Sequence, residues 1–189
     1  MLKRQFEKLT DVLIENEISK SEDKELIVHG LTLGMELVFN TITTIVLGLV
    51  FGLVLESLIF AISFSAIRTY AGGFHCKKAT NCYFFSSVMV VMVLSIVKFT
   101  LKGYILVISI IMLLFSAPVI LKLAPVETPT KPLDEAEQKY FRKKTILHLC
   151  IECFLVGVLF VLNLNEFGYM VCIGIMMSAG LVFLQKQLS

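Results

Sequence analysis

An apolar stretch of about 42 residues, from Leu26 to Ile67, sets the strongest limit on how this chain can fold. As one straight helix it would be about 63 Å long, roughly twice the thickness of the hydrocarbon core of a membrane. It must therefore turn back once, and the residues that allow a turn lie between Gly48 and Ser57. Hydrophobic residues make up 57% of the sequence and the mean hydropathy is +0.84, which is high for a soluble domain. The chain is predicted to be an integral membrane protein.

The other apolar runs complete an all-α, polytopic pattern of about six membrane-spanning helices. A span needs about 20 predominantly apolar residues, and short polar segments part the runs into pieces of that length. Two longer polar loops follow the second and fourth spans, at residues 70–81 and 122–144, and a charged helix start is expected from Asp134 to Lys144. The predicted spans lie near residues 28–48, 52–69, 82–99, 103–121, 145–163 and 167–185.

The N-terminal residues follow a different pattern. From Leu2 to Ile18, apolar residues recur at spacings of three to five with charged residues between them. This pattern indicates an amphipathic helix, which lies in the membrane interface or packs on the rest of the protein. Ser19 followed by Glu22 resembles a capping box and predicts that the next helix starts there. We therefore divide the chain into an amphipathic helix, residues 1–18, and a membrane domain, residues 19–189.

The distribution of positive charge predicts the orientation of the spans. Six crossings place both termini on one side of the membrane. Of the 17 Lys and Arg residues, only Lys98 and Lys102 fall on the opposite side. Because positively charged segments stay in the cytoplasm, both termini and both long loops are predicted to be cytoplasmic.

Loop 70–81 and the start of the next span hold the residues best suited to chemistry. His75 and Cys82 supply a base and a nucleophile. In a straight helix these two residues would be about 10.5 Å apart along the axis, but Gly72 and Gly73 free the backbone to fold His75 back onto Cys82. Thr80 is predicted to cap the following helix, so that Cys82 lies in its first turn, where the helix dipole favours thiolate. A thiolate beside an imidazole is an activated nucleophile for acyl transfer.

Other interpretations of the reactive residues stay open. A His and a Cys seven apart also occur by chance, and Cys76 competes with Cys82 as the nucleophile. Cys150 and Cys153 form a CxxC motif, which together with Cys76 and Cys82 would suit a membrane thiol-redox carrier or a small transporter. We favour a cysteine peptidase that uses His75 and Cys82, because thiols in the predicted cytoplasmic half are kept reduced, and we expect no metal and no cofactor.

Glu36 and Glu152 lie well inside predicted spans, where a carboxylate is costly and often functional. Glu36 in the first span is a candidate to orient His75, or to pair with Arg68 or His29. Glu152 in the fifth span is treated in the same way.

Several short motifs, in their order and spacing, resemble the accessory gene regulator protein B family of Gram-positive bacteria. The resemblance covers essentially the whole chain, including its length and topology, although Cys76 is not part of the family pattern. The residues that carry it are Arg68, Ala71-Gly72-Gly73-x-His75 and Cys82 around the first loop, Leu33-Gly34-Met35 in the first span, and Ala124-Pro125 and Lys131-Pro132 in the second loop.

The resemblance implies a membrane cysteine endopeptidase with His75 and Cys82 as its catalytic pair and Arg68 and Gly73 as supporting residues. Such an enzyme cuts a quorum-sensing precursor peptide at the C-terminal side of the signal segment and promotes closure of a thiolactone or lactone ring. The implied location is the bacterial cell membrane. The expected partners are a precursor with an acidic C-terminal tail and membrane lipid; a homodimer is allowed and no nucleic acid is expected.

Positive charges in the second loop have two interpretations. They anchor the topology, or they dock the acidic tail of the precursor. The candidate docking residues are Lys131, Lys139, Arg142, Lys143 and Lys144.

Overall fold

The computed structural model describes residues 2–15, 21–72, 79–127 and 133–188. These residues form helices joined by short connections and contain no strand, which confirms the all-α prediction. The chain divides into two compact units, Met1–Thr43 and Thr44–Ser189, and each is described by itself. The predicted division at residue 18 separates an amphipathic helix from a membrane domain and not two compact units, and it stays a prediction.

The first unit contains α1 (Leu2–Glu15), the short 3-10 helix η1 (Ser21–Asp23) and the first part of α2 (Lys24–Phe51). The side chains of Leu9 and Val12 on α1 are exposed, as suits a helix that turns apolar residues towards a membrane interface. A salt bridge joins Lys24 to Asp11. The helix start predicted at Ser19 lies outside the described residues.

The second unit contains the end of α2 and five further long helices. The helices are α3 (Val54–Ala71), α4 (Ala79–Phe99), α5 (Ile105–Leu123), α6 (Glu135–Val161) and α7 (Asn165–Leu188), with the 3-10 helix η2 (Lys102–Tyr104) ahead of α5. Across the described residues, six helices, α2 to α7, are long and apolar enough to cross a membrane, in agreement with the six predicted spans.

The turns between the spans lie where the sequence predicted them. Gly52 joins α2 to α3 with a φ of +71°, a conformation that favours glycine. Asn163, with a φ of 59°, lies between α6 and α7. A capping box of Asp134 and Glu137 starts α6, so the expected charged helix start and the fifth span form one continuous helix.

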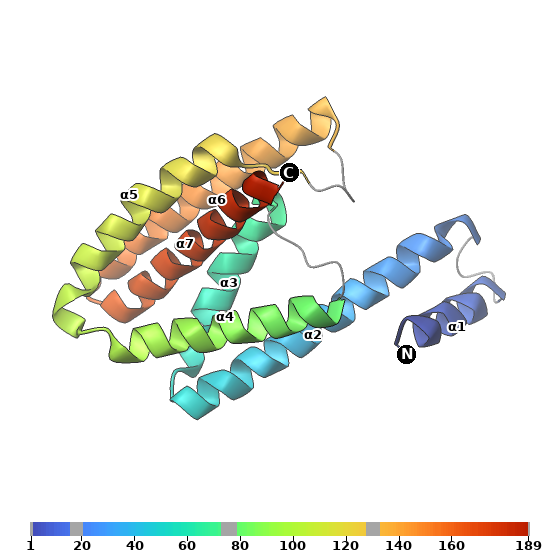
Figure 1. The fold of residues 1–189 in the computed structure, drawn as a ribbon, viewed down its shortest axis with the longest axis horizontal. Coiled ribbons are helices and arrows are strands. Elements are labelled where there is room, and N and C mark those ends of the chain that lie inside the picture. The colour runs from blue at the N-terminus through green and yellow to red at the C-terminus, as the bar shows by residue number, and fades with distance from the viewer. Residues whose placement is uncertain (1, 16–20, 73–78, 128–132, 189) are drawn as a thin grey trace. The chain divides into compact units, whose positions relative to one another are not determined.

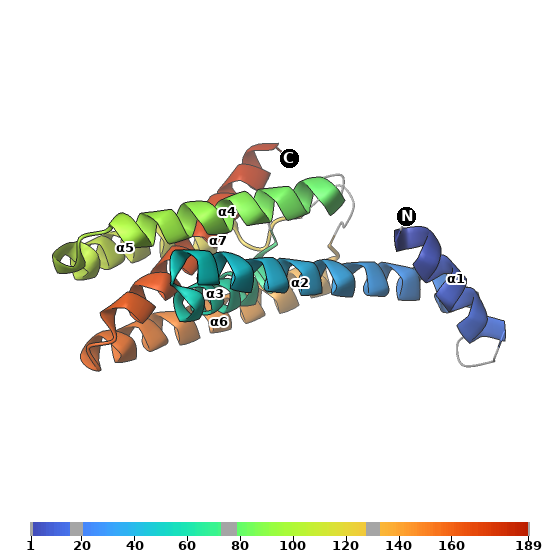
Figure 2. The same ribbon diagram turned by 90° about the horizontal axis from the view of Figure 1, so that it is seen from below.

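The centre of the second unit is α7, which packs against α3, α5 and α6 (Figure 1). Buried residues make up 67% of its membrane-spanning stretch but only 22% of the corresponding stretches of α5 and α6. The rotated view follows the same helices from below (Figure 2). A Cβ atom on Gly174 of α7 would lie 2.5 Å from Ser63 Oγ of α3, so this glycine lets the two backbones approach closely.

The remaining long helix, α4, joins this core through buried apolar side chains. Val93 and Leu94 of α4 belong to the same buried cluster as Phe60 of α3 and Tyr169 of α7. Next to the end of α4, Thr100 Oγ1 and Tyr169 Oη lie 3.2 Å apart, within hydrogen-bond distance. These contacts hold the second half of α4 against α3 and α7.

Candidate functional site

Cys82 lies in the first turn of α4, with a free, half-buried thiol. The helix begins at Ala79, so Thr80 is its second residue and the cap predicted at Thr80 is wrong. His75, together with Gly73 and Cys76, lies outside the described residues, and its pairing with Cys82 stays a prediction.

The loop that carries His75 leaves α3 at a fixed point, Gly72. Its φ of +73° and ψ of −153° lie in a region that glycine alone adopts readily. The Gly72 N–H donates to the Arg68 carbonyl (3.1 Å), and the Val126 N–H donates to the Ala71 carbonyl (3.0 Å). A Cβ atom at position 72 would lie 2.6 Å from the Val126 carbonyl oxygen. The backbone conformation at position 72 and the lack of room for a Cβ atom therefore both require glycine where the loop begins.

Backbone pairing between Gly72 and Val126 joins the end of α3 to the segment that follows α5. The segment after α5 is held further by Glu127, whose carboxylate accepts from Gln138 Nε2 of α6 (2.6 Å) and whose carbonyl lies 3.5 Å from Gln185 Nε2 of α7. We call this part of the second unit the loop end: it is formed by the last turns of α3, α5 and α7 and the first turns of α6.

Aromatic rings fix the last turn of α3 against α6 at the loop end. The Tyr70 ring stacks on His148, with centroids 4.9 Å apart and planes 15° apart, and lies 6.3 Å from the Phe141 ring. Two residues earlier on α3, the Arg68 guanidinium lies 5.4 Å from the centroid of the Phe64 ring. Sequence reasoning missed Tyr70. Phe141 and His148 are seven residues apart and share a helix face, but nothing in the sequence pairs that face with Tyr70.

The candidate docking residues do not share one surface. Lys139 and Arg142 line a cleft between α5 and α6. Lys144 lies 5.7 Å from the centroid of the Tyr140 ring, and its direction from the helix axis differs from that of Lys139 by about 140°. Lys143 is exposed, and Lys131 lies outside the described residues. A single tail could not contact all of these side chains in one extended pose.

The two acidic residues predicted inside spans differ in their surroundings. Glu36 is half-buried in α2 and belongs to the first unit, and its role towards His75 stays a prediction. Glu152 of α6 is only 5% exposed and accepts a hydrogen bond from Ser63 Oγ (2.7 Å), which also lies 3.3 Å from the Val171 carbonyl. Ser63 thus connects α3, α6 and α7 within the membrane-spanning core, and the sequence did not single it out.

The cysteines of the CxxC motif lie on α6 within its membrane-spanning stretch. Cys150 is exposed and Cys153 is half-buried, and Cys172 of α7 is fully buried. All three are free thiols in the structure. Searching the described residues finds no group of three or more His, Cys, Asp or Glu side chains arranged to hold a metal ion.

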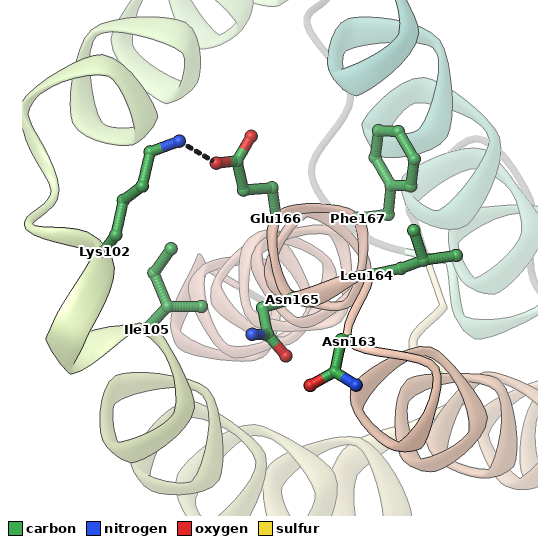
Figure 3. Close-up of a pocket in the computed structure, with 7 residues that line it drawn as sticks. All are labelled: Lys102, Ile105, Asn163, Leu164, Asn165, Glu166 and Phe167. Atoms are coloured by element: carbon green, nitrogen blue, oxygen red, sulfur yellow. Dashed lines mark ion pairs between the residues drawn. The ribbon is translucent and has the colours of Figure 1, made fainter.

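A second cavity, of about 230 Å³, lies at the opposite end of α5 and α7 (Figure 3). Across it, Lys102 Nζ and Glu166 Oε1 form an ion pair of 2.6 Å. Lys102 and Lys122 lie at opposite ends of α5, about 30 Å apart. The ion pair therefore ties the start of α5 to the start of α7, remote from the loop end.

Together, the six helices that are long and apolar enough to cross a membrane and the lack of strands among the described residues define a multi-pass, all-α membrane protein. A sequence model of the family described as Accessory gene regulator B matches residues 6–184 of the chain. The protein belongs to the accessory gene regulator B family, which acts in quorum sensing.

Curated relatives agree with this membership. The chain is 27% identical over 177 residues to a putative AgrB-like protein of Clostridium perfringens (strain SM101 / Type A), covering 90% of this chain and 83% of the relative. It is 30% identical over 148 residues to the accessory gene regulator protein B of Staphylococcus intermedius, covering 74% of this chain and 77% of that protein. No solved structure matches the chain.

Proposed function

We propose that this protein is a membrane cysteine endopeptidase that cleaves a quorum-sensing precursor peptide at the C-terminal side of its signal segment. The observation that carries the proposal is the free, half-buried thiol of Cys82 in the first turn of α4. The start of a helix also offers free backbone N–H groups to a negatively charged reaction intermediate. The preceding loop supplies His75 and begins at the anchored Gly72. Membership of a family that processes quorum-sensing peptides also favours this function.

The proposed reaction has two acyl transfers. His75 takes the proton from Cys82, and the thiolate sulfur attacks the carbonyl carbon at the end of the signal segment. Backbone N–H groups at the start of α4 donate to the oxyanion. The peptide C–N bond breaks, His75 returns the proton to the leaving amine, and Cys82 holds the signal segment as a thioester.

Ring closure follows from the thioester. A Cys or Ser side chain within the signal segment attacks the same carbonyl, a thiolactone or lactone forms, and the proton of the attacking group returns to Cys82. A thioester lies uphill of a peptide bond, so removal of the released tail must draw the first step forward by mass action. Exclusion of water at the membrane edge limits hydrolysis of the intermediate.

The acidic tail of the precursor is the proposed partner of the positive charges on α6. Lys143 and Lys144 lie a little over two turns after the helix start at Glu135, beside the loop end. Long side chains with positive charge attract a carboxylate-rich segment and steer its approach. The supporting roles are assigned to Arg68, Gly72 and Gly73 at the start of loop 70–81, and to Glu36 in α2.

A comparison of two cysteine variants tests the nucleophile. Purified protein is incubated with its cognate precursor, and intact mass spectrometry follows the released tail and any acyl group on the enzyme. Cys82→Ser is expected to abolish release of the tail and the thioester adduct, whereas Cys76→Ser keeps both. Cleavage that survives in Cys82→Ser and is lost in Cys76→Ser would overturn the assignment.

A further inference from the structure

A positively charged cleft opens at the loop end, between the last turn of α5 and the first turns of α6. Its volume is about 430 Å³, within the range of small-molecule sites. The polar residues in its lining are Lys122 from α5 and Glu135, Gln138, Lys139 and Arg142 from α6. Three cations and one carboxylate leave the cleft with a net positive charge, so it favours an anionic ligand.

The cations of the cleft have free donors for such a ligand. Arg142 places Nη2 3.4 Å from the Leu121 carbonyl, which occupies one of the five N–H donors of its guanidinium. The salt bridges formed among the described residues involve neither Lys122 nor Lys139. A guanidinium with two ammonium groups beside it is well matched to the oxygens of a phosphate group.

The position of the cleft points to the membrane. Lys122 lies in the last turn of α5, where its membrane-spanning stretch ends, and Arg142 precedes the apolar part of α6 by less than one turn. Basic residues at the ends of spans lie at the level of the lipid headgroups. Basic pockets between membrane helices at that level are suited to acidic headgroups.

Exposed apolar side chains continue from the cleft along both helices. On α5, Pro118 is exposed one turn before Lys122, and Phe115 is 73% exposed one turn before that. On α6, Ile146 is exposed one turn after Arg142, on the same face. A headgroup in the cleft would therefore have apolar surface directly below it for acyl chains.

We infer that the cleft between α5 and α6 binds an anionic phospholipid, whose phosphate is held by Lys122, Lys139 and Arg142. The exposed apolar surface next to the cleft favours a lipid over an acidic peptide. Acyl chains can pack on that surface, whereas a carboxylate-rich tail cannot. The site also divides the predicted docking set: Lys139 and Arg142 hold lipid, and Lys143 and Lys144 remain for the precursor tail. The inference does not depend on the proposed peptidase activity.

The test uses full-length protein purified in detergent. Dioctanoyl phosphatidylglycerol, dioctanoyl phosphatidylcholine and inorganic phosphate are titrated separately, with binding measured by native mass spectrometry and by the shift in melting temperature. The cleft variant is Lys122→Gln with Arg142→Gln. The matched control is Lys143→Gln with Lys144→Gln, which removes the same charge from positions outside the lining of the cleft.

Phosphatidylglycerol is expected to bind wild type about tenfold more tightly than phosphatidylcholine or inorganic phosphate. The cleft variant should weaken phosphatidylglycerol binding by about tenfold, since it removes charge-assisted hydrogen bonds, and the control should change it by less than about twofold. If the cleft variant loses its melting transition, the single variant Lys139→Gln replaces it in the comparison with the control.

Four results would overturn the inference. Equal binding of phosphatidylcholine would show that the headgroup charge is irrelevant. Equal weakening in the cleft and control variants would indicate diffuse attraction without a site. Binding of inorganic phosphate as tight as that of phosphatidylglycerol would assign the cleft to a free anion, and displacement of phosphatidylglycerol by a soluble acidic peptide would assign it to a peptide.

Discussion

At the scale of single residues, the geometry of loop 70–81 depends on how α3 ends. Gly72 adopts a positive φ, and its Cα faces the Val126 carbonyl so closely that a side chain has no room. The loop with His75 starts at this point, and α4 with Cys82 follows it. A change of backbone direction at Gly72 would move the base relative to the nucleophile, and acyl transfer is sensitive to errors of about 1 Å.

Gly72→Ala is therefore expected to cost about 1–3 kcal/mol of stability and to lower the rate of precursor cleavage. Thermal unfolding in detergent and the initial rate of tail release measure the two effects. Gly180→Ala is the matched control, because a Cβ atom there meets nothing within 4 Å. Equal loss of stability in both variants would contradict the role assigned to Gly72.

The hydrogen bond between Ser63 and Glu152 gives a second prediction at this scale. Ser63→Val removes the partner of a buried carboxyl group, which should cost about 1–3 kcal/mol and lower the melting temperature. Glu152→Gln keeps a hydrogen bond to Ser63 and should be close to wild type. Thr69→Val, at an exposed position of the same helix, controls for the substitution itself. If Glu152→Gln proved as unstable as Ser63→Val, a charge on Glu152 would be required instead of the hydrogen bond.

At the scale of elements, α6 has a charged first part and a membrane-spanning second part. Its first three turns carry most of its charge, and the rest is membrane-spanning. The Asp134 side chain accepts from the Glu137 N–H (2.7 Å), so the capping box starts the helix well before the membrane. The helix thereby holds its basic residues at defined directions: Arg142 faces α5, and Lys144 lies beside Tyr140.

Charge reversal on α6 tests the proposed docking of the precursor tail. Lys143→Glu with Lys144→Glu is expected to weaken precursor affinity roughly five- to tenfold at low salt, and the difference from wild type should shrink as salt rises. Fluorescence anisotropy with a labelled precursor measures both effects. Lys186→Glu, at an exposed lysine near the end of α7, is the control. Unchanged affinity in the double variant would exclude docking at these lysines.

At the scale of the whole molecule, the uneven distribution of positive charge predicts that both termini and the loop end face the cytoplasm. Single cysteines introduced in a background without the natural cysteines test this orientation. Gly103→Cys should react with a membrane-impermeant maleimide in intact cells, whereas Glu127→Cys should react only after the cells are opened. The reverse pattern would place the loop end, and with it Cys82, outside the cell.

The sequence alone determined the spans, their turns and the place of Cys82 in the first turn of a helix. Backbone groups within a membrane must bond inside their own helix, so runs of apolar residues are enough to define the helices. The cap predicted at Thr80 is wrong because the helix starts at Ala79, two residues before the start that this cap implies. Helix ends are decided by local hydrogen bonds that composition only partly controls.

Only the tertiary structure decided which helix faces meet. It paired Tyr70 with His148, gave Glu152 its partner Ser63, joined Gly72 to Val126 and separated Lys139 and Arg142 from Lys144. Each of these contacts joins residues on different elements or different faces of one helix. The direction of a side chain around a helix can be read from its position in the chain, but the neighbour that it meets depends on how the helices pack.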